Sequence, residues 1–193
     1  MRNSALSVVL ISLMSLGVSA CTVNINVPPS MVPNTTDGAQ SSDRQVEMFA
    51  EMMIPHHQQA IDMSNLALSL SESDDVKDLA KRIIAGQTPE IELMATWIDD
   101  SEANGSMGMM GGYAMGGMAS DEEMAALATL SGTEFDQEFL SLMIPHHEGA
   151  LQMVHMIEGS SDAEVSQLAE DIVRVQTAEI VEMEALLEDT HGA

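Results

Sequence analysis

The chain contains the same eleven-residue pattern twice. Residues 53–63 read MIPHHQQAIDM, and residues 143–153 read MIPHHEGALQM. The two copies lie ninety residues apart and hold four of the six histidines. A repeat of this kind indicates a single core built from two similar halves. Imidazole and thioether donors that recur at fixed spacing are also typical of a metal site.

Composition favours helices over sheets. The chain has 193 residues, of which 18 are Met and only 3% are aromatic. Ala, Leu, Met, Glu and Gln are good helix formers, whereas a β-sandwich or barrel needs aromatic and β-branched runs. The formal net charge of −25 attracts cations and argues against nucleic acid as a partner, although a solvated acidic surface accounts for most of it. We therefore expect an all-α protein.

A second repeated pattern follows each copy of the motif. Apolar, small and amide side chains recur every three or four residues over 80–98 and again, at an offset of 89, over 169–187. This spacing is the buried stripe of an amphipathic helix. Each half is then a helical hairpin that cannot cover its apolar face alone. Packing the two hairpins together predicts an antiparallel four-helix bundle with approximate two-fold symmetry.

The first twenty residues have the pattern of an export signal. Arg2 supplies a positive start, and residues 6–18 form an apolar stretch that is too short to remain as a membrane span. Small residues before Cys21, the only cysteine, resemble the lipobox of bacterial lipoproteins, in which the signal is removed and the cysteine carries the lipid. The alternative is ordinary cleavage after Ala20. We expect a signal peptide over 1–20 and a lipid on Cys21.

The rest of the chain divides into a tether and one domain. Pro, Asn, Ser and Thr without helical periodicity predict a flexible tether over 21–42. The domain over 43–190 contains repeat one (43–103), a Met- and Gly-rich loop (104–119) and repeat two (120–190). Ser120 and Ser161, each followed three residues later by a Glu, are the expected N-caps of two helices. Helices are expected over 43–70, 76–101, 120–130, 132–159 and 161–189.

The doubled motif places its donors on one helical face. At about 100° per residue, two thioethers, two imidazoles and one alanine of each copy fall within an arc of about 120°, the width of a core-facing stripe. The alanine, Ala60 or Ala150, lies in the middle of the arc and leaves space beside the imidazoles. The donors are Met53, His56, His57 and Met63 in the first copy and Met143, His146, His147 and Met153 in the second.

Thioether sulfur combined with neutral imidazole favours soft ions. Copper as Cu(I) is the expected ligand, and Ag(I) should fit the same site. Methionine needs no deprotonation and remains a ligand in an oxidising compartment, where cysteine tends to pair or oxidise. Zinc is less suited because it prefers cysteine, histidine and carboxylate. The alternative is structural, since buried Met is often core filler. A His-His pair repeated in register, with Met on both sides, argues against that alternative.

Pro55 and Pro145 precede the two His pairs. A proline inside a helix removes a backbone hydrogen bond and costs roughly 3 kcal/mol. Either each proline bends its helix and so aims the neighbouring side chains, or each begins a new helix, where it costs little. The sequence leaves both possibilities open.

Further candidates lie on the second helix of each half and in the loop. Gln87 and Gln176 could orient the imidazoles by hydrogen bonding to them, or could hydrogen-bond to each other. Met94 and Met183 are core residues by default and accessory ligands otherwise, and His155 is expected at the surface. The loop methionines could form a capture or relay site for soft ions, or only a low-complexity linker. They are Met107, Met109, Met110, Met115 and Met118.

Both copies of Met-x-x-His-His-x-x-Ala-x-x-Met are followed by Gln-Thr-x-Glu-Ile-x-x-Met, and together they resemble the DUF305 family of exported bacterial proteins. Phe49 and Phe139, four residues before each motif Met, fit the same pattern. The resemblance covers about 43–103 and 133–190. It implies a ferritin-like four-helix bundle and metal binding by the four histidines and their Met neighbours. Some members bind copper or silver outside the cytoplasm and aid tolerance of those metals.

We therefore expect a lipid-anchored protein of the bacterial cell envelope that sequesters or relays Cu(I) or Ag(I) in metal tolerance or homeostasis. Its expected partners are the metal ion, the membrane and a metal-accepting protein of unknown identity. One alternative is a non-catalytic helical interaction module that binds metal incidentally. Another is a ferritin-like di-iron oxidase, but the Glu-x-x-His spacing that it needs occurs only at Glu188 and His191. No paired nucleophile and base, phosphate loop or cofactor fingerprint is evident, so an enzyme is not expected.

Overall fold

Five helices make up the part of the chain that the structure, a computed structural model, describes: residues 35–98 and 116–191, with side chains over 42–98 and 116–190. No strand occurs in these residues, so the all-α class is confirmed. The helices are α1 (Thr35–Leu70), α2 (Asp74–Ala95), α3 (Asp121–Leu127), α4 (Gly132–Val154) and α5 (Ala163–His191).

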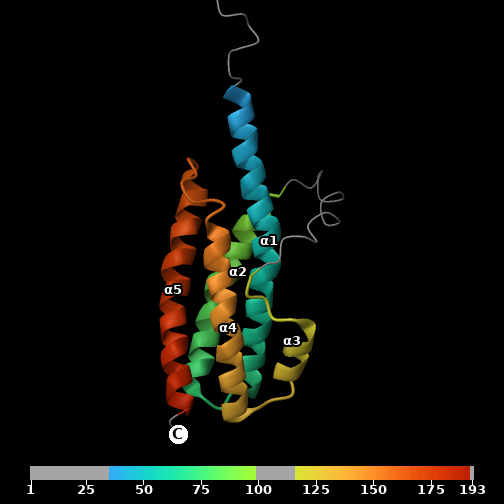
Figure 1. Cartoon of the computed structure of the whole chain (residues 1–193), viewed down its shortest axis with the longest axis vertical. Helices are drawn as coiled ribbons and strands as arrows, with labels where there is room; N and C mark the ends of the chain where they lie inside the picture. The colour runs from blue at the N-terminus through green and yellow to red at the C-terminus, as the bar shows by residue number, and fades with distance from the viewer. Residues whose placement is uncertain (1–34, 99–115, 192–193) are drawn as a thin grey trace, which may run out of the picture. The chain divides into compact units, whose positions relative to one another are not determined.

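Two helical hairpins pack into a bundle. The helices α1 and α2 form one hairpin, and α4 and α5 form the other (Figure 1). The hairpins meet mainly where α1 packs on α4, and the contact of α2 with α5 completes the bundle. The colours of Figure 1 show α1 and α5 running in one direction and α2 and α4 in the other. The short helix α3 lies against the α4 side of the bundle.

Capping side chains set where three of the helices begin. The Ser73 hydroxyl accepts a hydrogen bond from the backbone N–H three residues on, at 3.3 Å, and starts α2. Ser120 and Glu123 form the reciprocal capping box that the sequence predicts for α3. The expected Ser161 cap is wrong. Asp162 instead accepts from the backbone N–H two residues on, at 2.8 Å, because aspartate caps a helix as well as serine does and lies directly before α5.

The first helix begins earlier than the sequence predicts. Its first residue is Thr35, eight residues before the expected start at Asp43, so 35–42 is helix rather than tether. No proline follows Pro33 in this stretch, and extending an existing helix costs far less than nucleating one. The rest of the predicted tether, the signal peptide and Cys21 lie outside the described residues.

Two apolar clusters fill the bundle, and residues at equivalent positions of the two repeats lie in opposite clusters. Each cluster contains one of the buried phenylalanines Phe49 and Phe139 and three methionines that the repeat relates, and Met52 is a fourth buried methionine in the cluster of Phe49. An offset of ninety residues relates the methionines of the first helices, and an offset of 89 relates those of the second helices. This exchange indicates an approximate two-fold axis between the clusters. One cluster contains Met53, Met94 and Met153, and the other contains Met63, Met143 and Met183.

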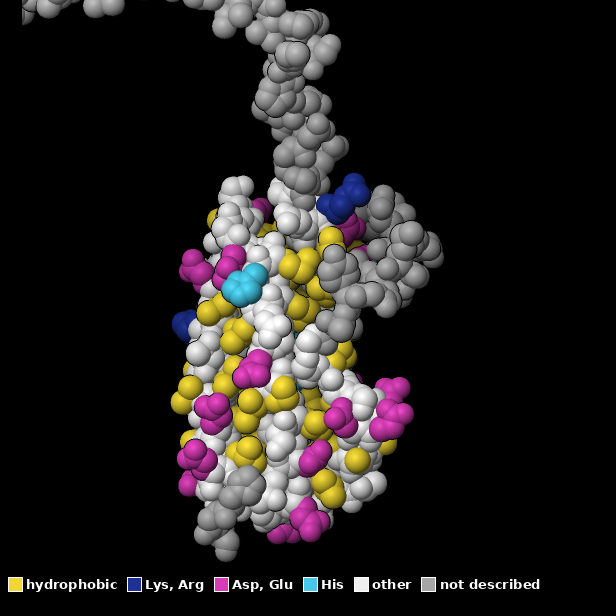
Figure 2. Space-filling view, in the orientation of Figure 1, with side chains coloured by type: hydrophobic (Ala, Val, Ile, Leu, Met, Phe, Trp, Pro, Cys, Tyr) yellow, Lys and Arg dark blue, Asp and Glu magenta, His cyan; other side chains and the backbone are white. Residues whose placement is uncertain are grey.

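The visible face of the described residues carries more acidic than basic side chains (Figure 2). Figure 2 shows Asp and Glu side chains spread over the visible face, with few Lys and Arg among them. This distribution agrees with the formal net charge of −25 and favours cations in the surrounding solution. Within the described ranges, no helix is long and apolar enough to cross a membrane.

Candidate metal centre

The eight donors of the doubled motif are all buried inside the bundle. The side chains of His56, His57 and His147 are fully inaccessible, and His146 is 1% exposed. The four methionines of the motif are also buried, the most exposed at 7%. The inward orientation that the helical periodicity predicts is therefore observed in both copies.

The two copies meet in one layer at the middle of the bundle. The imidazole rings of His56 on α1 and His146 on α4 lie with their centroids 3.7 Å apart and their planes tilted by 34°. The ring of His147 lies 6.3 Å from that of His146. The first helices of the two hairpins therefore bring donors from both motifs together, with one methionine-containing apolar cluster on each side.

Two carboxylates from the second helices hold the outer imidazoles. The Nε2 atom of His57 lies 2.7 Å from a carboxylate oxygen of Glu90 on α2. The Nε2 atom of His147 lies 2.9 Å from the matching oxygen of Glu179 on α5. A carboxylate accepts hydrogen bonds, so each Nε2 carries the proton and donates it. A neutral imidazole held in this way presents the lone pair of Nδ1, as in carboxylate–histidine–metal arrangements.

Glu90 and Glu179 are absent from the site residues that the sequence predicts. Both occupy the Glu position of Gln-Thr-x-Glu-Ile, at the same offset of 89 that relates the second helices. That repetition is the sequence signal that could have identified both glutamates as site residues. Without the fold, nothing pairs a carboxylate on one helix with an imidazole about thirty residues earlier on another.

A backbone carbonyl holds the third imidazole. The Nε2–H of His56 donates to the carbonyl oxygen of Gly116, at 3.2 Å. His146 has no hydrogen-bond partner at either ring nitrogen within the described residues. One atom is thus left without a partner in every ring of the layer. It is Nδ1 of His56, His57, His146 and His147.

Burial keeps the central pair of imidazoles uncharged. Desolvation lowers the pKa of His56 from 6.5 to about 4, opposed by its hydrogen bond to Gly116. Desolvation and the neighbouring imidazole of His56 lower the pKa of His146 to about 2. Both rings are therefore neutral at pH 7, so a metal ion meets a free lone pair and displaces no proton.

Gln87 and Gln176, at equivalent positions of the two halves, are both buried amides. Gln87 is 4% exposed and Gln176 is 2% exposed. Both amide atoms of Gln87 and the carbonyl oxygen of Gln176 are buried without a hydrogen-bond partner in the described part of the chain. Gln87 therefore binds neither an imidazole nor the other amide.

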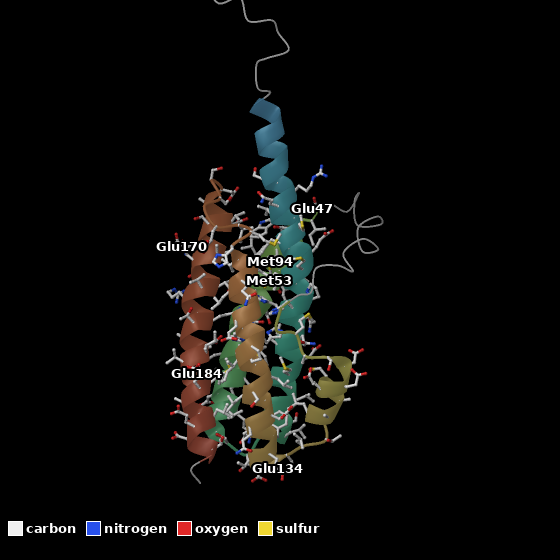
Figure 3. All side chains as sticks on the ribbon, in the orientation of Figure 1. Glu47, Met53, Met94, Glu134, Glu170 and Glu184 are labelled. Atoms are coloured by element: carbon white, nitrogen blue, oxygen red, sulfur yellow. The ribbon has the colours of Figure 1, made fainter. Side chains whose placement is uncertain are left out.

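The second-helix methionines extend the thioether groups on each side of the histidines. Met94 and Met183 are fully buried, one in each apolar cluster. Figure 3 shows Met94 of α2 beside Met53 of α1, which belongs to the same cluster. Each side of the imidazole layer thus offers three repeat-related sulfur atoms, and Met52 adds a fourth on the side of Met53. The role of the motif and second-helix methionines as ligands stays a prediction.

Residues 116–119, the end of the Met-rich loop, pack directly on the histidine layer. Gly117 has a φ of +79°, and a Cβ atom there would lie 1.9 Å from the carbonyl oxygen of Pro145. A Cβ atom on Gly149 would lie 1.7 Å from the carbonyl oxygen of Gly116. Only glycine allows this approach of one backbone to the other. Met118 is partly buried here, whereas Met107, Met109, Met110 and Met115 lie outside the described residues.

A side-chain clasp fixes this segment over α1. The amide of Gln59 accepts from the Ala119 N–H and donates to the Ala119 carbonyl, both at 2.8 Å. The position equivalent to Gln59 in the second copy is Gly149, where the same segment needs space rather than a clasp. The two motifs therefore differ at this position, Gln59 against Gly149, because residues 116–119 contact them differently. The hydrogen bonds of Gln59 keep this segment where the Gly116 carbonyl meets His56.

Pro55 and Pro145 lie inside the continuous helices α1 and α4. The alternative that each proline begins a new helix is therefore wrong. Both side chains are exposed, so each ring faces solvent while the residues that follow it face the core. Tertiary packing of the apolar face outweighs the one backbone hydrogen bond that each proline removes.

The donor set fits a soft ion. Within the described residues, no three His, Cys, Asp or Glu side chains gather around one point, so a site made of these groups alone is not present there. The unpartnered Nδ1 atoms lie instead in a layer between two groups of thioethers. Imidazole with thioether is the donor combination that Cu(I) and Ag(I) prefer.

We predict that Gln59→Ala releases the 116–119 segment. The variant removes both hydrogen bonds to Ala119 and should cost about 1–3 kcal/mol of stability. Imidazole nitrogen NMR should show that His56 no longer holds its proton only on Nε2. Gln58→Ala is the matched control, because Gln58 is exposed and, among the described residues, its side chain donates to Asp62 rather than to the 116–119 segment. An unchanged His56 spectrum in Gln59→Ala would contradict the clasp.

We predict that the metal-free protein loses stability as the pH falls below 6.5. His56 and His146 stay neutral when folded but bind protons near pH 6.5 when unfolded, so their contribution is complete above that pH and declines toward about pH 4. Urea unfolding should show a loss of about 2–3 kcal/mol between about pH 7 and about pH 5.5. The double variant His56→Gln, His146→Gln should lack this part of the slope, and an identical slope would refute the assignment.

Comparisons with known proteins agree with this geometry. The family described as "Domain of unknown function (DUF305)" matches residues 47–187. Curated protein sequences gave no match. CopM in its Cu(II)-bound form is 39% identical, with a TM-score of 0.61 over 75% of this chain and 96% of that chain. CopM has also been solved with Cu(I) and with Ag bound.

Two further solved structures come from named organisms. A DUF305 protein of Streptomyces coelicolor is 31% identical, with a TM-score of 0.65 over 78% of this chain and 94% of that chain. A DUF305 fragment of Deinococcus radiodurans is 34% identical, with a TM-score of 0.60 over 75% of this chain and 96% of that chain. The profile match and these identities together establish that the chain belongs to the DUF305 family.

Proposed function

We propose that this protein is an extracytoplasmic metal-binding protein that sequesters or relays Cu(I) and Ag(I). The observation that carries the proposal is the buried layer of four imidazoles with unpartnered Nδ1 atoms between two groups of thioethers. CopM binds copper and silver and is 36–39% identical to this chain, which supports the same ions here.

Burial of the donors favours holding an ion over performing chemistry on a substrate. The four histidines are at most 1% exposed, so an ion bound to them would be kept from solvent. Exclusion of water strengthens binding and limits exchange with external ligands. We therefore propose a non-catalytic role in metal tolerance or homeostasis, with a metal-accepting protein as the partner of a relay.

The interaction-module alternative accounts poorly for the centre. A buried polar atom without a partner costs about 1–3 kcal/mol, and the layer contains several such atoms. A purely structural core would gain stability from apolar residues at the same positions. A bound ion gives the unpartnered nitrogens their partner and so accounts for their presence.

We predict that Ag(I) stabilises the folded protein through His56 and His146. A ligand that binds only the native state raises the free energy of unfolding, by about 2.7 kcal/mol when the free ligand is at a hundredfold excess over Kd, and therefore raises the melting temperature. The double variant His56→Ala, His146→Ala should bind Ag(I) at least about tenfold more weakly and so lose about half of the stabilisation or more.

The matched control is His155→Ala, because His155 is 69% exposed and, in the described part of the chain, pairs with the neighbouring Glu158 rather than with the buried layer. Ag(I) titration against a competing chelator, with native mass spectrometry for stoichiometry, measures all three proteins. Equal Ag(I) binding by the double variant and the wild type would place the ion elsewhere and refute the proposal.

We further propose that the chain is exported with residues 1–20 as its signal and is anchored by a lipid on Cys21. Metabolic labelling with a radioactive fatty acid in a bacterial host should label the wild type and not Cys21→Ser. Ser19→Ala is the control for a neighbouring change that keeps the cysteine. Label on Cys21→Ser, or the absence of label from both the wild type and Ser19→Ala, would refute the anchor.

A further inference from the structure

A small cavity with four polar and acidic side chains in its lining lies between α2 and α5, on the side of the bundle away from the main α1–α4 contact. It has a volume of about 40 Å³. Its polar walls come from equivalent positions of the two halves, so it lies on the approximate two-fold axis. These residues are Gln87 and Glu90 of α2 and Gln176 and Glu179 of α5.

The cavity is lined by amides that have no partner. Gln87 and Gln176 are at least nine-tenths buried, and three of their four polar side-chain atoms have no hydrogen-bond partner in the described residues. Each such atom costs about 1–3 kcal/mol unless something polar occupies the space. A volume of about 40 Å³ exceeds the roughly 10–15 Å³ of such space that one water molecule needs. The space therefore admits a small ion with water.

The charges around the cavity favour a cation. Glu90 and Glu179 are 16% and 8% exposed, and each uses its Oε2 atom to hold a histidine. Among the residues that line the cavity, the one fixed cation is Arg82. Its guanidinium donates to both carboxylate oxygens of Glu182, at 2.5 and 2.6 Å, and is thereby directed to that surface pair. Two carboxylates thus face a small space that no fixed positive charge of the lining fills.

We propose that this cavity is a second cation site, which takes a hard divalent ion such as Mn²⁺ or Ca²⁺ rather than Cu(I) or Ag(I). Its ligands are carboxylate oxygens of Glu90 and Glu179 and amide oxygens of Gln87 and Gln176, with water completing the shell. An all-oxygen set suits hard divalent ions and contains no soft donor. The amides are essential to it, because no three His, Cys, Asp or Glu groups converge within the described residues.

The test is a Mn²⁺ titration of the mature chain, followed by electron paramagnetic resonance, with and without bound Ag(I). One Mn²⁺ per chain should bind above the weak, diffuse binding of an acidic surface, whether or not Ag(I) is present. The double variant Glu90→Gln, Glu179→Gln should weaken that binding at least about tenfold.

The matched control is Glu92→Gln with Glu184→Gln, which removes the same charge from exposed positions of α2 and α5. Figure 3 shows Glu184 on the outer side of α5. This control should change the Mn²⁺ affinity by less than about twofold, since separated surface charges in salt are largely screened. Equal weakening in both pairs, or no binding above the diffuse level, would mean an adventitious ion only and overturn the proposal.

A third variant keeps every oxygen ligand and removes the space. Gly86 lines the cavity, and a Cβ atom there would meet nothing within 4 Å. Gly86→Leu should fold, because leucine is a better helix former than glycine, and should abolish the tight Mn²⁺ binding. Retained binding would contradict the site. Failure of Ag(I) to bind the wild type would refute the proposed function alone, since the Mn²⁺ result does not depend on it.

Discussion

The close contact of two uncharged imidazoles across the α1–α4 interface is the constraint on which the rest of the structure depends. His56 and His146 stack at 3.7 Å only because burial removes their charge, since two protonated rings at that distance would repel. Within the described residues, each hydrogen bond of these rings is donated by an Nε2–H, to a carboxylate oxygen of Glu90 or Glu179 or to the Gly116 carbonyl. The core therefore positions polar rings yet leaves their second nitrogens free.

The two halves are alike in their helices and unlike where residues 116–119 cross them. His56 donates to a backbone carbonyl, whereas His146 has no partner at either nitrogen. Gln59 and Gly149 occupy equivalent positions: Gln59 hydrogen-bonds to residues 116–119, whereas Gly149 has no side chain and so leaves space for them. The central pair is therefore inequivalent, and the Met-rich loop ends within bonding distance of one ring.

The sequence predicted the features of the fold that follow from helical periodicity. The doubled motif identified the face that turns inward, and the repeat predicted two hairpins, because burial of an apolar stripe needs no knowledge of the partner helix. The Glu90 and Glu179 contacts and the Gln59 clasp could not be predicted, since they join residues between 32 and 60 positions apart. The start of α1 was also missed, because propagation of a helix leaves no side-chain signal there.

Division of the donors between two hairpins has a thermodynamic consequence. His56 and His57 belong to one hairpin and His146 and His147 to the other, so neither hairpin alone offers the complete set. Once one hairpin holds an ion, the other presents its donors at an effective concentration that the covalent link keeps in the millimolar range or above. Under the proposed function, the chain would act as a chelator whose two arms are held together by their own hydrophobic packing.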